Sequence, residues 1–158
     1  MCADRKKVGG KMNLFSEIKK LIKKYPGLIV EEGENIISVK PGTDNGFEVW
    51  FSEDEMEYTV GFDGWHQHFE KSEVEDALNC FDFGFSSKCR LKVLSRGGKD
   101  YKWILEVYED GEWVCGSTTG LFNFAFWKKA EIKYLSNVFR NKKMNNKSEK
   151  ATVKTEGH

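Results

Sequence analysis

Apolar side chains recur at the spacing of an amphipathic helix in two stretches of the chain. The first stretch ends at Pro26-Gly27, carries lysines on its polar side, and has an apolar stripe formed by Leu14, Ile18, Leu21, Ile22 and Tyr25. The second follows Ser72 and Glu75, which have the spacing of a capping box, and its stripe consists of Val74, Ala77, Leu78, Phe81 and Phe85. A shorter stripe indicates a last helix over about residues 128–139, with Ile132, Leu135 and Val138 or Phe139 inward. The pattern therefore predicts three helices.

Between these helices, apolar and polar residues alternate as they do in half-buried strands. The segments before the second helix are residues 28–32, 35–40, 47–52, 55–63 and 65–70. Those after it are residues 89–95, 100–110, 112–118 and 121–127. Short turns such as Asp110-Gly111 favour antiparallel pairing, because parallel strands need long crossovers. We expect an α+β fold in which one antiparallel β-sheet of about six to eight strands carries the three helices mainly on one face.

The length of 158 residues fits one domain of ordinary size. We expect residues 1–12 to form a flexible leader, residues 13–140 a single α+β domain, and residues 141–158 a disordered lysine-rich tail. No apolar run approaches the roughly 18 residues of a membrane helix, and the first residues lack the apolar stretch of a secretion signal. These features predict a cytoplasmic protein without membrane contact. The four cysteines have no C-x-x-C spacing and are expected to be reduced.

A formal net charge of zero conceals a strong polarity along the chain. Residues 28–87 contain fifteen acids and two lysines, whereas the segments on either side carry more bases than acids. An acidic surface of this kind suits the steering of a basic partner toward its binding site. We therefore expect a small non-enzymatic protein-binding module, in one version an immunity-like inhibitor of a basic partner. The expected partner-binding residues are Trp50, Glu53, Asp54, Glu55, Trp65 and Glu70.

The segment 63–70, DGWHQHFE, supports an alternative function. Side chains two apart share a face of a strand, so His66, His68 and Glu70 would point the same way. Two imidazoles and a carboxylate could bind zinc, with Asp63 or a remote acid completing the ligand set. The alternative is therefore a metal-binding protein or metal-dependent enzyme with zinc as its cofactor. The protein-binding interpretation requires no cofactor, and the simplest view of the segment is a strand with a polar outer face.

Other chemistry has less support in the sequence. Cys115 precedes the Gly- and Thr-rich segment 116–120, but a cysteine packed at a strand end explains it more simply. Neither of the common glycine-rich phosphate-binding motifs occurs. Several bases could converge with Tyr or Trp rings to bind nucleic acid, namely Arg90, Lys92, Arg96, Lys99 and Lys102. The acidic middle of the chain would repel the phosphate backbone unless it lay on another side of the fold, so we do not expect nucleic acid as the partner.

Overall fold

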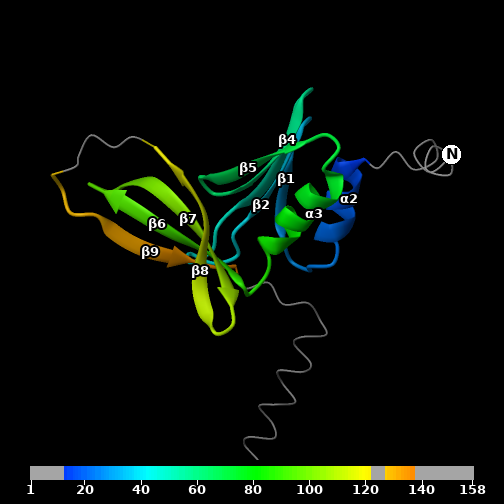
Figure 1. Ribbon diagram of the computed structural model, residues 1–158. Helices are drawn as coiled ribbons and strands as arrows, with labels where there is room; N and C mark the ends of the chain where they lie inside the picture. The colour runs from blue at the N-terminus through cyan, green and yellow to red at the C-terminus, as the bar shows by residue number, and fades with distance from the viewer. Residues whose placement is uncertain (1–12, 122–126, 138–158) are drawn as a thin grey trace, which may run out of the picture.

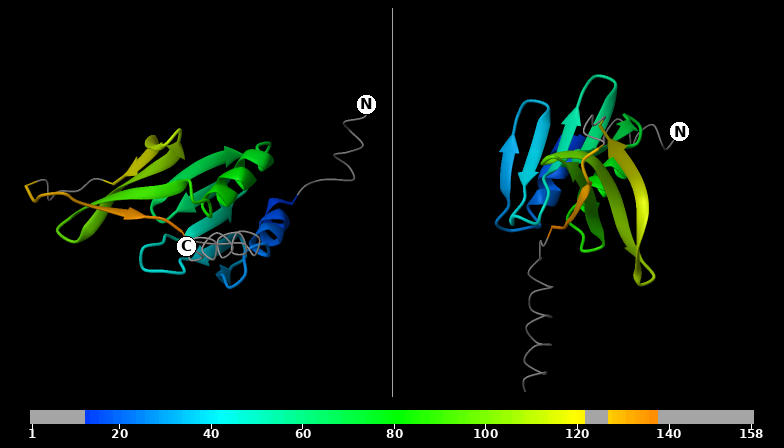
Figure 2. Two further views of the ribbon diagram at one scale, coloured as in Figure 1. Left: turned by 90° about the horizontal axis from the view of Figure 1, so that it is seen from below. Right: turned by 90° about the vertical axis from the view of Figure 1, so that its left-hand side faces the viewer.

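The computed structural model describes residues 13–121 and 127–137, which form two helices and two antiparallel sheets (Figure 1). The helices are α2 (Leu14–Ile22) and α3 (Val74–Phe83). The five-stranded sheet follows chain order and contains β1 (Ile29–Glu32), β2 (Ile36–Lys40), β3 (Val49–Glu53), β4 (Glu57–Phe62) and β5 (Trp65–Glu70). The four-stranded sheet has the order β8-β7-β6-β9 and contains β6 (Cys89–Arg96), β7 (Lys99–Glu109), β8 (Glu112–Gly120) and β9 (Glu131–Leu135). The four-stranded sheet lies at one end of the molecule and the helices lie at the other (Figure 2).

The α+β class and the antiparallel pairing are confirmed, but the expectation of one sheet is wrong. After α3 the chain starts a second sheet at β6 instead of adding a strand to the edge of β5. Both sheets carry apolar side chains on one face, and packing these faces together buries more apolar surface than a single extended sheet would. The expected leader, the tail and residues 122–126 of the last expected strand lie outside the described residues.

The third helix, expected over about residues 128–139, is also a wrong prediction. Residues 131–135 form β9, which pairs antiparallel with β6 and places Leu135 opposite Leu91. The three-residue spacing of Ile132 and Leu135 fits a helix, but the backbone hydrogen bonds offered by the free edge of β6 outweigh that weak local pattern. Residues 138 and 139 lie outside the described part of the chain.

The first two helices form where the sequence predicts them, with different caps from those expected. Asn13 Oδ1 accepts hydrogen bonds from the N–H groups of Phe15 and Ser16 and so begins α2. The predicted capping box of α3 is wrong, because Glu73 is the N-cap residue and its side chain makes no capping bond. The Glu73 carboxylate instead accepts a hydrogen bond from the N–H of Glu70, at 2.7 Å, and so closes the turn that leads out of β5.

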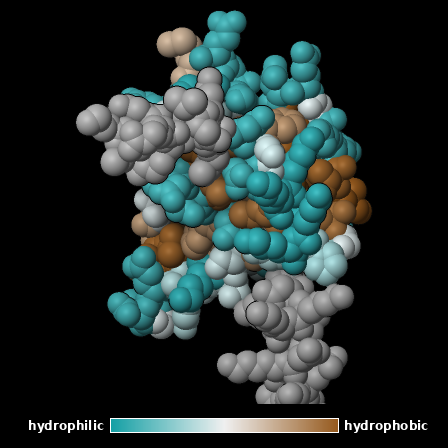
Figure 3. Space-filling model, turned by 90° about the vertical axis from the view of Figure 1, so that its right-hand side faces the viewer, coloured by the Kyte–Doolittle hydropathy of each residue, from teal (hydrophilic) through white to brown (hydrophobic). Residues whose placement is uncertain are grey.

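The helices cover one face of the five-stranded sheet, and the main core lies between them. This core consists of Leu14, Ile18, Ile37, Val49, Phe51, Val60, Phe62, Ala77 and Phe81, each at most 1% exposed. Buried side chains of the four-stranded sheet, among them Leu91 and Val93, belong to the same contiguous apolar cluster. Seen from the helical end, the surface is mainly hydrophilic with separate apolar patches (Figure 3). Neither of the helices in the described residues is long and apolar enough to cross a membrane.

The two sheets meet along β5. Trp65 is 1% exposed, stacks on Phe62 and donates a hydrogen bond from its indole Nε1 to Ser117 Oγ of β8, at 3.0 Å. Gly64 lies directly against the indole ring of Trp103 of β7, and a Cβ atom at this position would collide with that ring. The glycine therefore permits an approach between the sheets that no other residue would allow.

Asn137, which follows β9, ties the end of the described chain to the main core. Its side chain is buried; Oδ1 accepts a hydrogen bond from the N–H of Phe47 at 2.9 Å, and Nδ2 donates to the carbonyl of Gly84 at 3.1 Å. The neighbouring Ser136 donates its backbone N–H to the carbonyl of Asn45. One amide thus satisfies two buried backbone groups from segments distant in sequence.

We predict that Asn137→Ala lowers the free energy of unfolding by about 2–4 kcal/mol, because it leaves a buried N–H and a buried carbonyl without partners. Urea denaturation followed by circular dichroism measures this loss. The matched control is Ser136→Ala, which keeps the backbone bond of that exposed residue and should change stability by less than about 0.5 kcal/mol. Equal stability of the two variants would contradict the role assigned to the Asn137 amide.

Candidate functional site

Acidic side chains gather at the end of the five-stranded sheet where β3 turns into β4 and β5 ends. We call this set the acidic rim; it consists of Glu53, Asp54, Glu55, Glu57, Glu70 and Glu73. The register brings them together, because β4 and β5 pair so that Glu57 lies opposite Glu70. The β3–β4 turn supplies three more acids, and the hydrogen bond from Glu70 N–H to Glu73 adds the last. Three of the expected binding acids, Glu53, Asp54 and Glu55, therefore lie in the same turn.

Asp54 also builds the turn that carries the rim. Its carboxylate accepts hydrogen bonds from the N–H groups of Met56, at 2.7 Å, and Glu57, at 2.8 Å. The hydrogen bond from Glu57 and then that from Met56 lower the pKa of Asp54. This residue is therefore fixed in its charged form, and its replacement would disturb the turn as well as the charge.

Few cations balance the rim. Lys71 is the one lysine or arginine in residues 41–87; its ammonium lies 3.6 Å from the carboxylate of Glu53 and 4.5 Å from the centre of the Tyr58 ring. His68 Nδ1 lies 2.7 Å from the carboxylate of Glu57, an ion pair only when the imidazole is protonated. The rim therefore keeps a large excess of negative charge at neutral pH.

Met56 is the residue at this end of the sheet that the sequence analysis missed. It is 80% exposed at the tip of the β3–β4 turn, with acids on both sides in the sequence. A large apolar side chain held out in solvent inside a charged surface is a common feature of protein interfaces, where Met is enriched. The signal available in the sequence was one apolar residue in the middle of the turn segment EDEME, residues 53–57.

The two tryptophans expected to serve as binding anchors have different positions. Trp65 is buried between the sheets and is 1% exposed, so its ring is not presented to a partner in this structure. It lies on the inner face because its partner in the register, Phe62, faces the core. Trp50 is half-buried on the sheet face that the helices leave uncovered, lies over Gly61, and donates its Nε1 hydrogen to the carbonyl of Asp63 at 2.9 Å.

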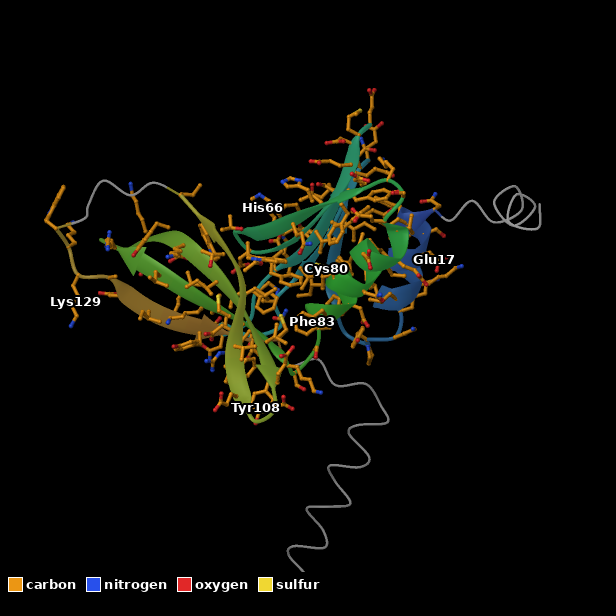
Figure 4. The ribbon with its side chains drawn as sticks, viewed as in Figure 1. Glu17, His66, Cys80, Phe83, Tyr108 and Lys129 are labelled. Carbon is orange, nitrogen blue, oxygen red and sulfur yellow. The ribbon has the colours of Figure 1, made fainter. Side chains whose placement is uncertain are left out.

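His66 and His68 share that uncovered face, as the alternation of the strand predicts. Figure 4 shows His66 on the opposite side of the sheet from Cys80 of α3. The centres of the two imidazole rings are 5.2 Å apart, and His68 Nδ1 also lies 3.0 Å from the hydroxyl of Thr59. In residues 13–121 and 127–137, no group of three or more His, Cys, Asp or Glu side chains is arranged so that it could hold a metal ion. The zinc site at His66, His68 and Glu70 stays a prediction.

Cys115 is exposed on β8, an edge strand of the four-stranded sheet. Cys80 and Cys89 are packed thiols, and burial raises the pKa of Cys80 to about 12. Neither Cys80 nor Cys89 resembles an activated thiol, whose pKa must be lowered rather than raised.

Asp63 holds the turn between β4 and β5 in a left-handed conformation with φ of 49°. Its carboxylate accepts a hydrogen bond from the N–H of Glu48 at 2.7 Å, and its own N–H donates to the Glu48 carbonyl. Burial is the main influence on this carboxyl and raises its pKa above the usual value, although the bond from Glu48 acts in the opposite direction. Asp63 is therefore a structural residue of the turn, and its carboxylate is bonded to the backbone of Glu48.

Comparison with known proteins gives no relatives: no family model matches the chain, and neither a curated protein nor a solved structure shows significant similarity to it.

Because burial raises the pKa of Asp63 in the folded state, folding favours the protonated carboxyl. The stability that this protonated carboxyl contributes is lost as the pH rises through the folded pKa. Asp63→Asn stays neutral, keeps an acceptor for Glu48 N–H and tolerates the left-handed conformation. We predict that the stability of Asp63→Asn relative to the unchanged protein increases from about pH 3 to pH 7. Urea titrations across this range measure the difference, with Asp44→Asn, an exposed loop substitution, as the control. A difference that decreases with rising pH would contradict this assignment.

Proposed function

We propose that the protein is a small, non-enzymatic binding module that recognises a basic protein through the acidic rim, with Met56 as its apolar anchor. The observation that supports this most strongly is the position of a largely exposed Met56 at the centre of converging carboxylates. Charge steers a basic partner to the surface but contributes little to the binding affinity, because solvent and salt screen exposed charges. A buried apolar side chain supplies the affinity that charge alone does not.

The geometry of the rim suits an interface rather than a reaction. Its carboxylates lie on the surface, and Asp54, whose pKa is lowered, accepts hydrogen bonds within its own turn. A general acid or base needs a pKa near the working pH, usually through burial or a close like charge. An inhibitor of a basic enzyme is one form of this function, since such an inhibitor can cover a cationic active site with carboxylates.

Glu55 and Glu70 are the best positions for testing the rim. Both are exposed, and their side chains form no hydrogen bond or ion pair with the part of the chain that the structure describes. Asp54 is unsuitable because its loss would disturb the turn. Glu34 and Asp44 are exposed acids of other loops in the same half of the molecule, and therefore provide a control with the same change in net charge.

We predict that Glu55→Lys with Glu70→Lys reduces the association rate of the natural partner about tenfold at low salt, and that this difference shrinks as salt is added, because screening removes the steering force. The partner is first captured from native lysate with the unchanged protein, and its association is then followed by stopped-flow or biolayer measurements. Glu34→Lys with Asp44→Lys should retain most of the original rate. If both double variants slow association equally, net charge rather than the rim is responsible and the proposal fails.

A further inference from the structure

The four-stranded sheet has an inner face, which contacts the first sheet, and an outer face. Residues opposite each other in neighbouring strands share a face, and Leu91 lies opposite Leu105 and Leu135, all three buried. The next residue along β6, Lys92, lies opposite Tyr134 on the other face. The contacts with β5 described above come from the inner face, and the helices lie at the far end of the molecule (Figure 1). The outer face is therefore left uncovered by these elements.

Aromatic rings and one arginine form an ordered row across this outer face. The guanidinium of Arg90 lies 4.2 Å from the centre of the Trp113 ring and 4.3 Å from that of Tyr134, so it is held between an edge strand on each side. Arg90 Nε also donates to the carboxylate of Glu106 at 2.7 Å. Tyr108 packs edge-on against Trp113 near the end of the β7–β8 hairpin (Figure 4). These contacts hold the rings in position before any ligand binds.

Two lysines add positive charge to this face. Lys92 and Lys102 point outward and form no ion pair with any described residue, whereas Glu106, the acid opposite Arg90, is engaged by that arginine. Tyr134 is 49% exposed and Tyr108 is 40% exposed, so both rings are open to solvent. We call these residues the basic aromatic face; they are Arg90, Lys92, Lys102, Tyr108, Trp113 and Tyr134.

We propose that the basic aromatic face binds single-stranded nucleic acid. Aromatic rings displayed on an antiparallel sheet stack on unpaired bases of any sequence, and lysines beside them neutralise the phosphates. Lys92 and Tyr134 are direct neighbours across β6 and β9, so one nucleotide can place its base on the ring and its phosphate near the ammonium. A peptide with carboxylates would use the lysines but would gain less from the rings, which is why nucleic acid fits the whole face better.

Acids near the basic aromatic face would repel the phosphate backbone of a nucleic acid. The acidic rim belongs to the five-stranded sheet, whereas the basic aromatic face belongs to the four-stranded sheet and looks away from the first. Screening at physiological salt confines the repulsion from exposed acids to roughly 8 Å. The two surfaces are separate, so this proposal does not depend on the protein partner proposed for the rim.

The test uses the full chain and fluorescently labelled oligothymidine and oligouridine of about 12 nucleotides, with binding followed by anisotropy at about 50 mM salt. We expect micromolar binding that weakens at least tenfold by about 200 mM salt, and much weaker binding of a duplex of equal length. Tyr134→Ala should weaken single-strand binding by about tenfold, whereas Tyr134→Phe, which keeps the ring, should bind normally. Lys92→Ala with Lys102→Ala should make binding less dependent on salt.

The control for lost positive charge is Lys23→Ala with Lys24→Ala, which removes two exposed bases that follow α2. This control should bind nearly as well as the unchanged protein. The proposal is overturned if no saturable binding occurs up to about 100 μM protein at low salt, a range that covers the affinities expected of such surfaces. It is also overturned if the control weakens binding as much as the Lys92 and Lys102 substitutions, or if Tyr134→Ala has no effect.

Discussion

The close approach of two indole rings to two glycines, one near the end of β4 and one in the turn between β4 and β5, determines how the whole molecule is put together. Trp50 lies against Gly61, Trp103 lies against Gly64, and a Cβ atom at either glycine would collide with the ring. The first contact lies on the uncovered face of the five-stranded sheet, and the second joins that sheet to β7. The side chain of Asp63, between the glycines, fixes the turn through Glu48. Four consecutive residues thus shape one sheet and position the other.

This junction leaves two surfaces with opposite charge on different sheets. Because β5 packs against the inner face of the four-stranded sheet, that sheet turns its bases and exposed rings outward. The end of the β3–β4 hairpin displays the acidic rim. A chain with zero formal net charge can therefore present strong local fields, which net charge alone would never reveal.

Local signals in the sequence predicted local structure well. Apolar stripes at helical spacing and the turn residues between strands predicted both helices of the described chain and the hairpins, because these elements depend on neighbours in sequence.

The prediction of a third helix was wrong because the backbone hydrogen bonds of β9 come from β6, about forty residues away, and the local spacing of apolar residues does not report them. The burial of Trp65 was missed for the same reason, because its partner Ser117 lies on another sheet. The rim acids lie on adjacent strands and turns, so residues that are close in sequence stay close in the fold. By contrast, the row formed by Arg90, Trp113 and Tyr134 requires the strand order β8-β7-β6-β9.

The contact between Gly64 and Trp103 makes the two sheets one cooperative unit that holds these surfaces apart. Native-state hydrogen exchange on Gly64→Ala is the decisive measurement, since the added Cβ must displace the indole ring. The slowest amides of β4 and β6 should have one common free energy of opening in the unchanged protein, and the substitution should lower both equally. Loss of protection in β6 with β4 unchanged would show instead that the sheets unfold separately and that this contact does not couple them.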